Sequence, residues 1–460
     1  MGKPLTVRPL KSSQTVGAVL AMQGMANAMP LLHGSQGCSA FTKVLFVRHF
    51  REPIPVQTTA MEQSSTIMGA DDNLMEALVT LSAKSGAEII GVIPTGLAAT
   101  QGSDIRRVIR GFRQEHPQWN EVSIIPIDAP DTTGSLESGF ALAVAAMIEQ
   151  LPTPKRAEGA SLARVNVLVG SSLTPGDLEE LRDLLGAFTL EVAFLPDISN
   201  ALDGHLGREA HRAVTGGGTG KGFFDAFDKA MATLVIGRSL FAVADGLRKR
   251  SVMPVLSFEH LMGLDATDEL VTQLCFMTRR AIPARVDRWR RQMLDAMLDA
   301  HFHLGEKRVA LAGERDLVAG FHDLLAEMGS HVVAAVIPHG VLHRPDISAV
   351  VGDLDDLETL ANRQGAELLI GNSHLDSSAS KLGIPLHLAG YPIFDRLGEF
   401  RRCRIGYRGG RDTLFALANL MLARPRRIVP YRSTLRACFT HSGAMNHDAR
   451  LVSNGHFAHG

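Results

Sequence analysis

The sequence predicts an α/β protein with three Rossmann-like domains, whose mostly parallel sheets are flanked by helices. The chain has 460 residues, more than one compact core usually holds, so two or three domains are expected. Short apolar runs alternate with amphipathic stretches along most of its length, as they do in successive βα units. A composition of 45% hydrophobic and 21% charged residues is that of a folded protein.

The first third of the chain contains three apolar runs that we expect to be buried strands, TKVLFV, AEIIGVIPT and VSIIPIDAP. Between the first two, DDNLMEALVTLSAKSG predicts a helix, because Leu74, Leu78 and Leu81 recur on one face between an Asp-rich start and a Gly stop. SDIRRVIRGFRQE and SLESGFALAVAAMIEQL predict two more helices. The polar stretch from Leu151 to Ser161 is rich in Pro and Gly and predicts a linker, so a first domain is expected over residues 1–155.

A second series of βα units is expected over residues 156–305. Its predicted strands are RVNVLVGS, LEVAFLPD, ATLVIG and MPVLSFE, with a helix over PGDLEELRDLLGAF. A long helix, ARVDRWRRQMLDAMLDAHFHLG, closes the series. Val286, Trp289, Met293 and Met297 recur there at helical spacing, a pattern that is typical of core packing.

A third α/β domain is expected over residues 306–425. RVALAGERDLVAGFHDLLAEMG predicts a strand leading into a helix, HVVAAVIP, AELLIGNSH and IPLHLAG predict further strands, and DTLFALANLMLA predicts the last helix. Residues 426–460 form a predicted C-terminal extension. Its histidines have a spacing that indicates no common helix face, so a loosely ordered extension is favoured over a metal site; they are His441, His447, His456 and His459.

Composition also excludes some classes of function. A formal net charge of −1 gives no electrostatic reason to expect a nucleic acid partner, and 5% aromatic residues make base-stacking surfaces improbable. No apolar run has the length of a membrane span or of a signal peptide core. We therefore expect a cytoplasmic protein that binds neither nucleic acid nor membrane.

The Gly-rich segment VTGGGTGKGFF, residues 214–224, invites comparison with phosphate-binding loops. A P-loop needs Ser or Thr after its lysine, but Gly222 follows Lys221 here. No strand is predicted immediately before the segment, so the dinucleotide-binding context is missing as well. We expect a mobile loop.

The four cysteines lie far apart and form no CxxC pair. Cys275, in VTQLCFM, is expected to be a small buried hydrophobic residue. Cys403 has arginines on both sides, which would favour its thiolate, yet a surface thiol without function is the preferred interpretation. The sequence around Cys438 indicates nothing.

Cys38 lies in HGSQGCSAF, a Gly/Ser/Gln turn with no second cysteine nearby. Three interpretations compete: a buried structural thiol, a nucleophile assisted by His33 or Glu62, and one ligand of a metal site that another chain completes. The residues alone leave all three open.

Three longer segments carry a family resemblance. HGSQGCSAF and AMEQSSTIMGADDNLMEAL resemble the cluster-binding region of the nitrogenase molybdenum-iron protein β subunit and its relatives. Residues 368–398, LLIGNSHLDSSASKLGIPLHLAGYPIFDRLG, are similar to the C-terminal domain of the same superfamily. The match runs in order over nearly the whole chain, and it implies the nitrogenase component 1 type of fold.

The departures from the nitrogenase β pattern are informative. That subunit holds an eight-iron cluster with three cysteines, but SQTVGA places Ser13 at the first of these positions and PTGLAAT places Gly96 at the third. Only the second cysteine, Cys38, is kept. One thiolate here and three from a partner would hold a single [4Fe-4S] cluster at a subunit interface. Small residues around Cys38, namely Gly34, Ser35 and Gly37, would let the backbone approach such a cluster.

With its single retained cysteine, the chain resembles the β-like subunit of the scaffold on which the nitrogenase iron-molybdenum cofactor is assembled. The resemblance implies an α-like E subunit as partner, two copies of each chain, and a cofactor precursor held mainly by that partner. Molybdenum and homocitrate would enter there, with the nitrogenase iron protein as donor, before transfer to apo-nitrogenase. No cysteine of this chain matches a cofactor ligand, so a structural and electron-relay role is implied instead of a catalytic one.

Two other classes of function stay open at this point. One is a catalytic β-type subunit, either of nitrogenase or of the light-independent protochlorophyllide or chlorophyllide reductases. The other is a metal-free α/β binding module in which Cys38 is inert.

Overall fold

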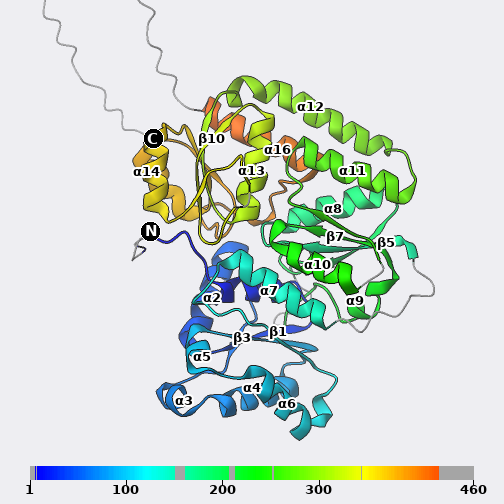
Figure 1. The fold of residues 1–460 in the computed structure, drawn as a ribbon, viewed down its shortest axis with the longest axis vertical. Helices are drawn as coiled ribbons and strands as arrows, with labels where there is room; N and C mark the ends of the chain where they lie inside the picture. The colour runs from blue at the N-terminus through cyan, green and yellow to red at the C-terminus, as the bar shows by residue number, and fades with distance from the viewer. Residues whose placement is uncertain are drawn as a thin grey trace, which may run out of the picture. The chain divides into compact units, whose positions relative to one another are not determined.

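The computed structural model describes residues 6, 8–150, 161–206, 213–250, 253–342 and 344–423. In these ranges the strands form three parallel sheets, each built from one part of the chain (Figure 1). The strands of the three sheets lie within residues 28–126, 161–258 and 308–388. The α/β class with parallel sheets flanked by helices is therefore confirmed. The domain boundaries stay a prediction, because most of the expected linker and the whole C-terminal extension lie outside the described residues.

The first sheet has the strand order β2-β1-β3-β4. Its central strand β1 is buried along its whole length between β2 and β3. Its elements are α1 (Gln14–Gln23), β1 (Ala28–His33), α2 (Gln36–Phe50), β2 (Gln57–Thr58), α3 (Gln63–Met68), α4 (Asp71–Lys84), β3 (Ile89–Pro94), α5 (Gly96–Gln101), α6 (Ile105–Glu115), η1 (Pro117–Trp119), β4 (Ser123–Pro126) and α7 (Leu136–Glu149).

The predicted strand TKVLFV is wrong, because these residues lie inside helix α2. The strand that pairs with β3 on the side away from β4 is β1, which the apolar pattern did not predict. Thr42, Phe46 and Phe50 of α2 are buried while Val44 and Val47 are exposed. That burial recurs every four residues, which is the period of a helix and not of a strand.

Helix α1 is fixed against α7 by two glycines. A Cβ atom on Gly17 would lie 1.9 Å from the Leu136 carbonyl oxygen, and one on Gly139 would lie 1.9 Å from the Gln14 carbonyl oxygen. Any larger residue at either position would push the helices apart. This contact positions the beginning of α1, where Ser13 is located.

The second sheet has the order β6-β5-β7-β8, with α8 and α10 on either side of it (Figure 1). Thr174 starts α8 with a capping box and is followed by Pro175 at the first helical position. The elements are β5 (Ser161–Val169), α8 (Pro175–Ala187), β6 (Glu191–Leu195), α9 (Gly222–Asp225), η2 (Phe227–Lys229), β7 (Ala230–Ile236), η3 (Arg238–Leu240), α10 (Phe241–Arg250), β8 (Val255–Phe258), α11 (Leu264–Thr278) and α12 (Ala284–Leu304).

The third sheet has the order β11-β10-β9-β12-β13. Asp353 begins α14 with a capping box, accepting hydrogen bonds from the backbone of Asp355 and Asp356. The elements are β9 (Arg308–Ala312), α13 (Arg315–Glu327), β10 (His331–Ile337), β11 (Ala349–Val351), α14 (Leu354–Gln364), β12 (Leu368–Gly371), η4 (Ser373–Leu375), α15 (Asp376–Leu382), β13 (Leu386–Leu388), η5 (Glu399–Arg401) and α16 (Gly406–Leu422).

The long helix α12 packs against α16, as the expected apolar stripe requires. Val286 and Met293 are buried, and Trp289 and Met297 are half-buried against the same core. The core-packing interpretation of this stripe is confirmed. No helix in the described part of the chain combines the length and apolar character needed to cross a membrane.

Candidate metal centre

Cys38 lies in the first turn of α2, directly after the carboxyl end of β1. Ser35 precedes this helix in an extended conformation, and no side chain caps the helix with a hydrogen bond. The Cys38 Sγ lies 3.6 Å from the Ser35 Oγ, and the cysteine is half-buried beside exposed Gln36 and Gly37. Uncapped backbone N–H groups at the positive end of a helix favour a negative ligand next to the thiol.

The two glycines of this turn serve different purposes. A Cβ on Gly34 would lie 2.2 Å from the Thr95 Oγ1, so this residue must be glycine for the loop to pack against Thr95, the residue that follows β3. A Cβ on Gly37 would meet nothing closer than the Ser35 Oγ at 3.9 Å. Gly37 therefore leaves open space next to Cys38, into which an inorganic cluster could fit.

The other two positions at which the nitrogenase β pattern has cysteines have structural roles here. Ser13 caps α1, and its Oγ accepts a hydrogen bond of 3.4 Å from the Val16 N–H. Gly96 is the first residue of α5, and its N–H donates to the Asp131 carboxylate. A Cβ on Gly96 would lie 2.4 Å from the Asp131 Oδ1, so a cysteine there would displace this acceptor.

A chain of contacts joins these positions at one end of the first sheet. The Thr95 N–H donates to the His33 carbonyl oxygen at 3.0 Å, which connects the Cys38 loop to the loop of Gly96. On the other side of Gly96, the segment after Asp131 reaches the beginning of α1, where the Thr133 Oγ1 donates to the Gln14 Oε1 at 3.2 Å. The structure therefore brings the three segments together at the carboxyl end of the sheet, where parallel α/β proteins usually bind ligands.

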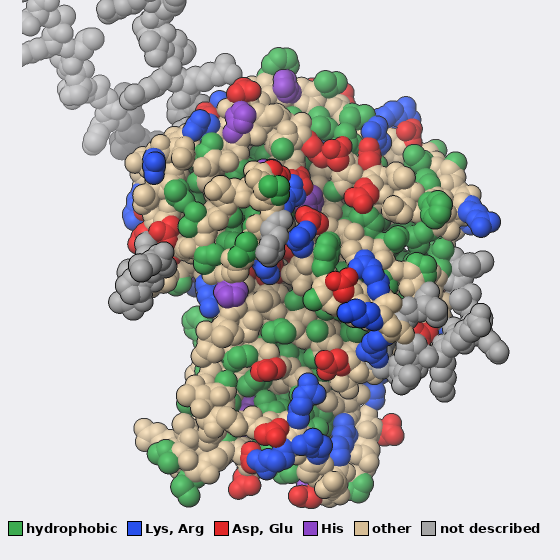
Figure 2. Space-filling model, in the orientation of Figure 1, with side chains coloured by type: hydrophobic (Ala, Val, Ile, Leu, Met, Phe, Trp, Pro, Cys, Tyr) green, Lys and Arg blue, Asp and Glu red, His purple; other side chains and the backbone are tan. Residues whose placement is uncertain are grey.

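Apolar side chains are exposed around this end of the sheet. Phe41 and Val44 of α2 are 64% and 55% exposed, and Leu97 of α5 is 36% exposed. Exposed apolar side chains that gather near a polar site favour a protein interface over bare surface. On the face drawn in Figure 2, positive and negative side chains both occur.

His33 and Glu62 do not assist Cys38. His33 is buried at the end of β1, where burial lowers the pKa of its imidazole to about 4, and its Nδ1 is 3.0 Å from the Thr59 Oγ1. Glu62 is exposed and belongs to the beginning of α3. Within the described residues, neither side chain forms a hydrogen bond with the thiol. The nucleophile interpretation thus has no base in place.

Of the other cysteines, Cys403 and Cys275 are part of the packed structure. Cys403 is half-buried and packs against the core, with its Sγ 3.4 Å from the Ile405 carbonyl oxygen, so the expectation of a surface thiol is wrong. Burial raises the pKa of this thiol well above its ordinary value, helped by Asp177 and Glu180. Cys275 is half-buried and packs against the core. Cys438 and the histidines of the extension lie outside the described residues.

The Gly-rich segment packs against the first sheet instead of standing free. The Thr215 Oγ1 accepts a hydrogen bond of 2.7 Å from the Ala28 N–H. Gly217 and Gly218 have positive φ angles, and a Cβ on Gly218 would lie 2.6 Å from the Gly24 carbonyl oxygen. Glycine is required here for close packing, which explains the motif without a nucleotide.

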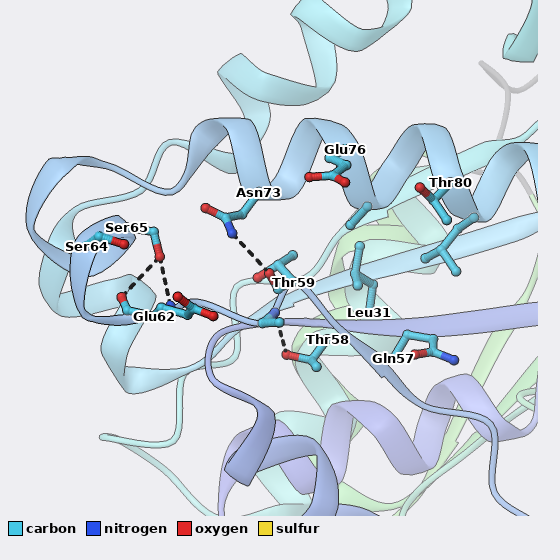
Figure 3. A pocket seen from close by; sticks show the side chains of 13 residues that line it. Leu31, Gln57, Thr58, Thr59, Glu62, Ser64, Ser65, Asn73, Glu76 and Thr80 are labelled. Atoms are coloured by element: carbon cyan, nitrogen blue, oxygen red, sulfur yellow. Dashed lines mark hydrogen bonds between the residues drawn. The ribbon is translucent and has the colours of Figure 1, made fainter.

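A groove that no sequence motif predicted adjoins the Cys38 loop (Figure 3). It has a volume of about 660 Å³, and Asn73 and Glu76 of α4 face Thr59 and Leu31 across it. The Thr58 Oγ1 donates to the Gly34 carbonyl oxygen at 2.9 Å, which links the groove to the turn before Cys38. The full lining is Leu31, Gln57, Thr58, Thr59, Ala60, Glu62, Ser64, Ser65, Asn73, Glu76, Ala77, Thr80 and Leu81.

One other group of potential metal ligands occurs in the described residues, formed by His322, Asp323 and Asp346. Arg344 already donates to both carboxylates, at 2.7 Å in each case. A guanidinium in this position takes the place that a metal ion would need. We interpret the group as an ion-pair network.

A family model described as "Nitrogenase component 1 type Oxidoreductase" matches residues 13–422. The chain belongs to this family. A solved structure titled "Nitrogenase Cp1 at pH 6.5" superimposes with a TM-score of 0.85 at 27% identity, covering 91% of this chain and 94% of the other. The expected nitrogenase component 1 type of fold is therefore confirmed.

Within the family, the resemblance to one kind of subunit is close. The chain is 41% identical over 459 residues to "Nitrogenase iron-molybdenum cofactor biosynthesis protein NifN" of Klebsiella pneumoniae, covering 99% of this chain and 98% of that protein. It is 42% identical to the protein of the same name from Nostoc, covering 91% and 94%. The resemblance to NifN that the single retained cysteine indicated is confirmed.

Proposed function

We propose that this chain is the β-like subunit of a scaffold complex on which the nitrogenase iron-molybdenum cofactor is assembled. The observation that carries this proposal is the similarity, along nearly the full length, to proteins named for the biosynthesis of that cofactor. Membership of the nitrogenase component 1 family supports a complex that works with metal-sulfur clusters.

In this proposal Cys38 supplies one thiolate of a [4Fe-4S] cluster, and the partner supplies the other three. Three features support the assignment: the thiol is half-buried, its helix start is uncapped, and exposed apolar side chains occur on the same helix and at the start of α5. In the described residues no set of three potential ligands includes Cys38. This agrees with a cluster whose remaining thiolates come from the partner.

The cluster, when bound, relays electrons through the complex. This chain supplies one of the four thiolate ligands, and its residues form part of the cluster's surroundings. The backbone N–H groups in the first turn of α2 are free to donate to cluster sulfurs, which raises the reduction potential. Gly37 keeps the approach to Cys38 open.

The partner in this proposal is a NifE-like α subunit, and two copies of each chain form a heterotetramer. The cofactor precursor is held mainly by that partner and receives molybdenum and homocitrate there. The nitrogenase iron protein delivers molybdenum and homocitrate, apo-nitrogenase accepts the finished cofactor, and the complex works in the cytoplasm. The exposed apolar side chains Phe41, Val44 and Leu97 fit a role in the contact with the partner.

The alternative, a catalytic β-type subunit of nitrogenase or of a protochlorophyllide or chlorophyllide reductase, is not favoured. An eight-iron cluster would need thiolates near Ser13 and Gly96, and both residues have other tasks here, as a helix cap and as a donor to Asp131. The curated relatives described above are biosynthesis proteins.

Replacing Cys38 tests the proposal. In the complex with the partner, Cys38→Ala should remove the EPR signal of the reduced [4Fe-4S] cluster and about four iron atoms per pair of chains. Cys275→Ala, which changes a half-buried cysteine far along the chain, should leave both unchanged. An unaltered signal and iron content in Cys38→Ala would overturn the assignment.

A second measurement separates scaffold from enzyme. The complex loaded with precursor should activate cofactor-free nitrogenase after addition of molybdate, homocitrate, reduced iron protein and ATP. A complex that instead reduces substrate by itself at nitrogenase-like rates would make it a catalytic subunit.

A further inference from the structure

Ser35 occupies the N-cap position of α2 but does not cap the helix. Its backbone is extended, as at other N-caps, yet no hydrogen bond joins its side chain to the backbone of the first turn. Serine is preferred at this position because its hydroxyl usually accepts such a hydrogen bond. Ser13 caps α1 in this way at 3.4 Å, and Thr174 caps α8 at 3.1 Å. The Ser35 hydroxyl is therefore available for another contact.

That contact is with the Cys38 thiol. The Ser35 Oγ lies 3.6 Å from the Cys38 Sγ, a distance at which a sulfur atom can share a hydrogen bond. In a free thiol either atom can donate the proton. A thiolate bound to iron carries no proton and can only accept. When Cys38 holds a cluster, the serine hydroxyl must therefore be the donor.

The backbone on both sides of this pair is fixed by other groups. Before it, the Gly34 carbonyl oxygen accepts a hydrogen bond of 2.9 Å from the Thr58 Oγ1. After it, the Cys38 carbonyl oxygen accepts one of 2.9 Å from the Thr42 Oγ1. Neither hydrogen bond involves the Ser35 hydroxyl, so we expect the turn to keep its shape when that hydroxyl is removed.

The open space beside Gly37 adjoins the serine. A Cβ on Gly37 would lie 3.9 Å from the Ser35 Oγ and would meet no nearer atom. Gly37 is exposed, whereas Ser35 and Cys38 are half-buried. The serine hydroxyl thus borders the space into which we place the cluster.

We propose that Ser35 acts through Cys38, by donating a hydrogen bond to the thiolate that raises the reduction potential of the cluster. This inference rests on the proposed function, in which Cys38 is a ligand of a [4Fe-4S] cluster. Reduction adds one electron, and hence negative charge, to the cluster and its thiolates. A hydrogen bond donated to a ligand sulfur stabilises that charge and favours the reduced form. Ser35 is in this sense a positioning residue and not an iron ligand.

Redox titration of the purified complex with its partner tests this, with the EPR signal of the reduced cluster as the readout. Ser35→Ala should keep the iron content and the signal of the fully reduced cluster, but its midpoint potential should shift to a more negative value. Ser35→Thr keeps a hydroxyl and should keep the potential close to that of the natural chain. Ser64→Ala, the same substitution at an exposed position in the groove, should change neither iron content nor potential.

A second measurement detects the proton of the hydrogen bond itself. After exchange of the reduced complex into D₂O, ENDOR spectroscopy should find an exchangeable hydrogen coupled to the cluster that is absent from Ser35→Ala and present in Ser35→Thr. A change in the turn that only altered its packing would not produce this pattern in both variants.

The outcomes separate this inference from the cluster assignment. An unchanged midpoint potential in Ser35→Ala, or an unchanged set of exchangeable couplings, would overturn the role of Ser35 and leave Cys38 as a ligand. Loss of iron from Ser35→Ala would also overturn it, because the serine would then be needed to hold the cluster. If the cluster assignment itself is wrong, Cys38→Ala keeps both the iron and the EPR signal.

Discussion

At the scale of single residues, Asp323 shows how partners set the charge of a carboxyl group. Burial by itself would raise the pKa of Asp323, but hydrogen bonds from His260, His322 and Arg344 outweigh burial and hold this pKa well below its ordinary range. The His260 Nε2 lies 2.8 Å and the His322 Nδ1 2.9 Å from the carboxylate oxygens. These partners come from the loop after β8, from α13 itself and from the loop after β10.

The stability that Asp323 contributes should depend on pH. A carboxyl group with a lowered pKa contributes its full stabilisation above its unfolded pKa of about 3.9. This contribution declines below that value and is lost only as the pH falls through the lower pKa of the folded state. Asp323→Asn should therefore cost about 2 kcal/mol near pH 7 and a smaller amount near pH 3, where part of the stabilisation remains. Thermal unfolding at both pH values measures this. Asp299→Asn, an exposed change on α12, should have little effect at either, and an equal cost for Asp323→Asn at pH 7 and pH 3 would contradict the prediction.

Sequence reasoning at this scale worked where a residue type limits the chemistry and failed where surroundings decide. Cys38 was selected because only a few residue types ligate iron, and it lies on an accessible turn. The surroundings of Cys403 were predicted incompletely, because groups that are distant in the sequence also act on its thiol. Asp177 and Glu180, more than 200 positions earlier, are among those groups.

At the scale of elements, α2 explains the one strand that was predicted wrongly. An apolar run of six residues fits a buried strand and one side of a helix equally well. Burial of Phe46 and Phe50 with exposure of Val44 and Val47 is a helical pattern that only the packed structure reveals. The exposed positions are the ones that we propose as a partner contact.

Helix α12 provides a test of packing at this scale. Met293 is fully buried and lies so close to Gly410 of α16 that a Cβ there would be 2.8 Å from its terminal carbon. Met293→Ala should destabilise the chain by about 2–5 kcal/mol, because it leaves a cavity between the two helices. Leu298→Ala, on the same helix but 71% exposed, is the matched control and should cost less than 1 kcal/mol. Denaturant unfolding compares the two, and equal losses would mean that α12 is not held by this stripe.

At the scale of the described structure, the three sheets meet around one buried group of charges. Glu137, from α7 at the end of the first sheet, is fully buried and accepts hydrogen bonds from Arg315 and from the Asp316 N–H of α13. Asp316 in turn accepts a hydrogen bond of 2.6 Å from the Ser239 hydroxyl, next to the second sheet. This network joins elements of all three sheets.

Removing the cation of this network should weaken the whole junction. Arg315→Met leaves buried carboxylates without their counter-charge, and since Arg315 is about a quarter exposed we expect a loss of about 3 kcal/mol. The measurement is thermal unfolding combined with limited proteolysis, which should become faster. Arg291→Met, which breaks an exposed pair with Asp287 on α12, should cost under about 1 kcal/mol. If both variants lose the same free energy of unfolding, the junction contributes no more to stability than an exposed ion pair does.

The sequence alone determined the alternation of strands and helices, the family, and the one thiolate left at the cluster position. These depend on local periodicity and on residue chemistry, which can be read along the chain. Only the tertiary structure decided that TKVLFV is part of a helix and that the Gly96 N–H donates to the Asp131 carboxylate. It also decided that Ser171, Glu314 and Tyr391 line one cavity. Those facts arise from contacts between residues tens to hundreds of positions apart, and no local pattern specifies which distant side chains will meet.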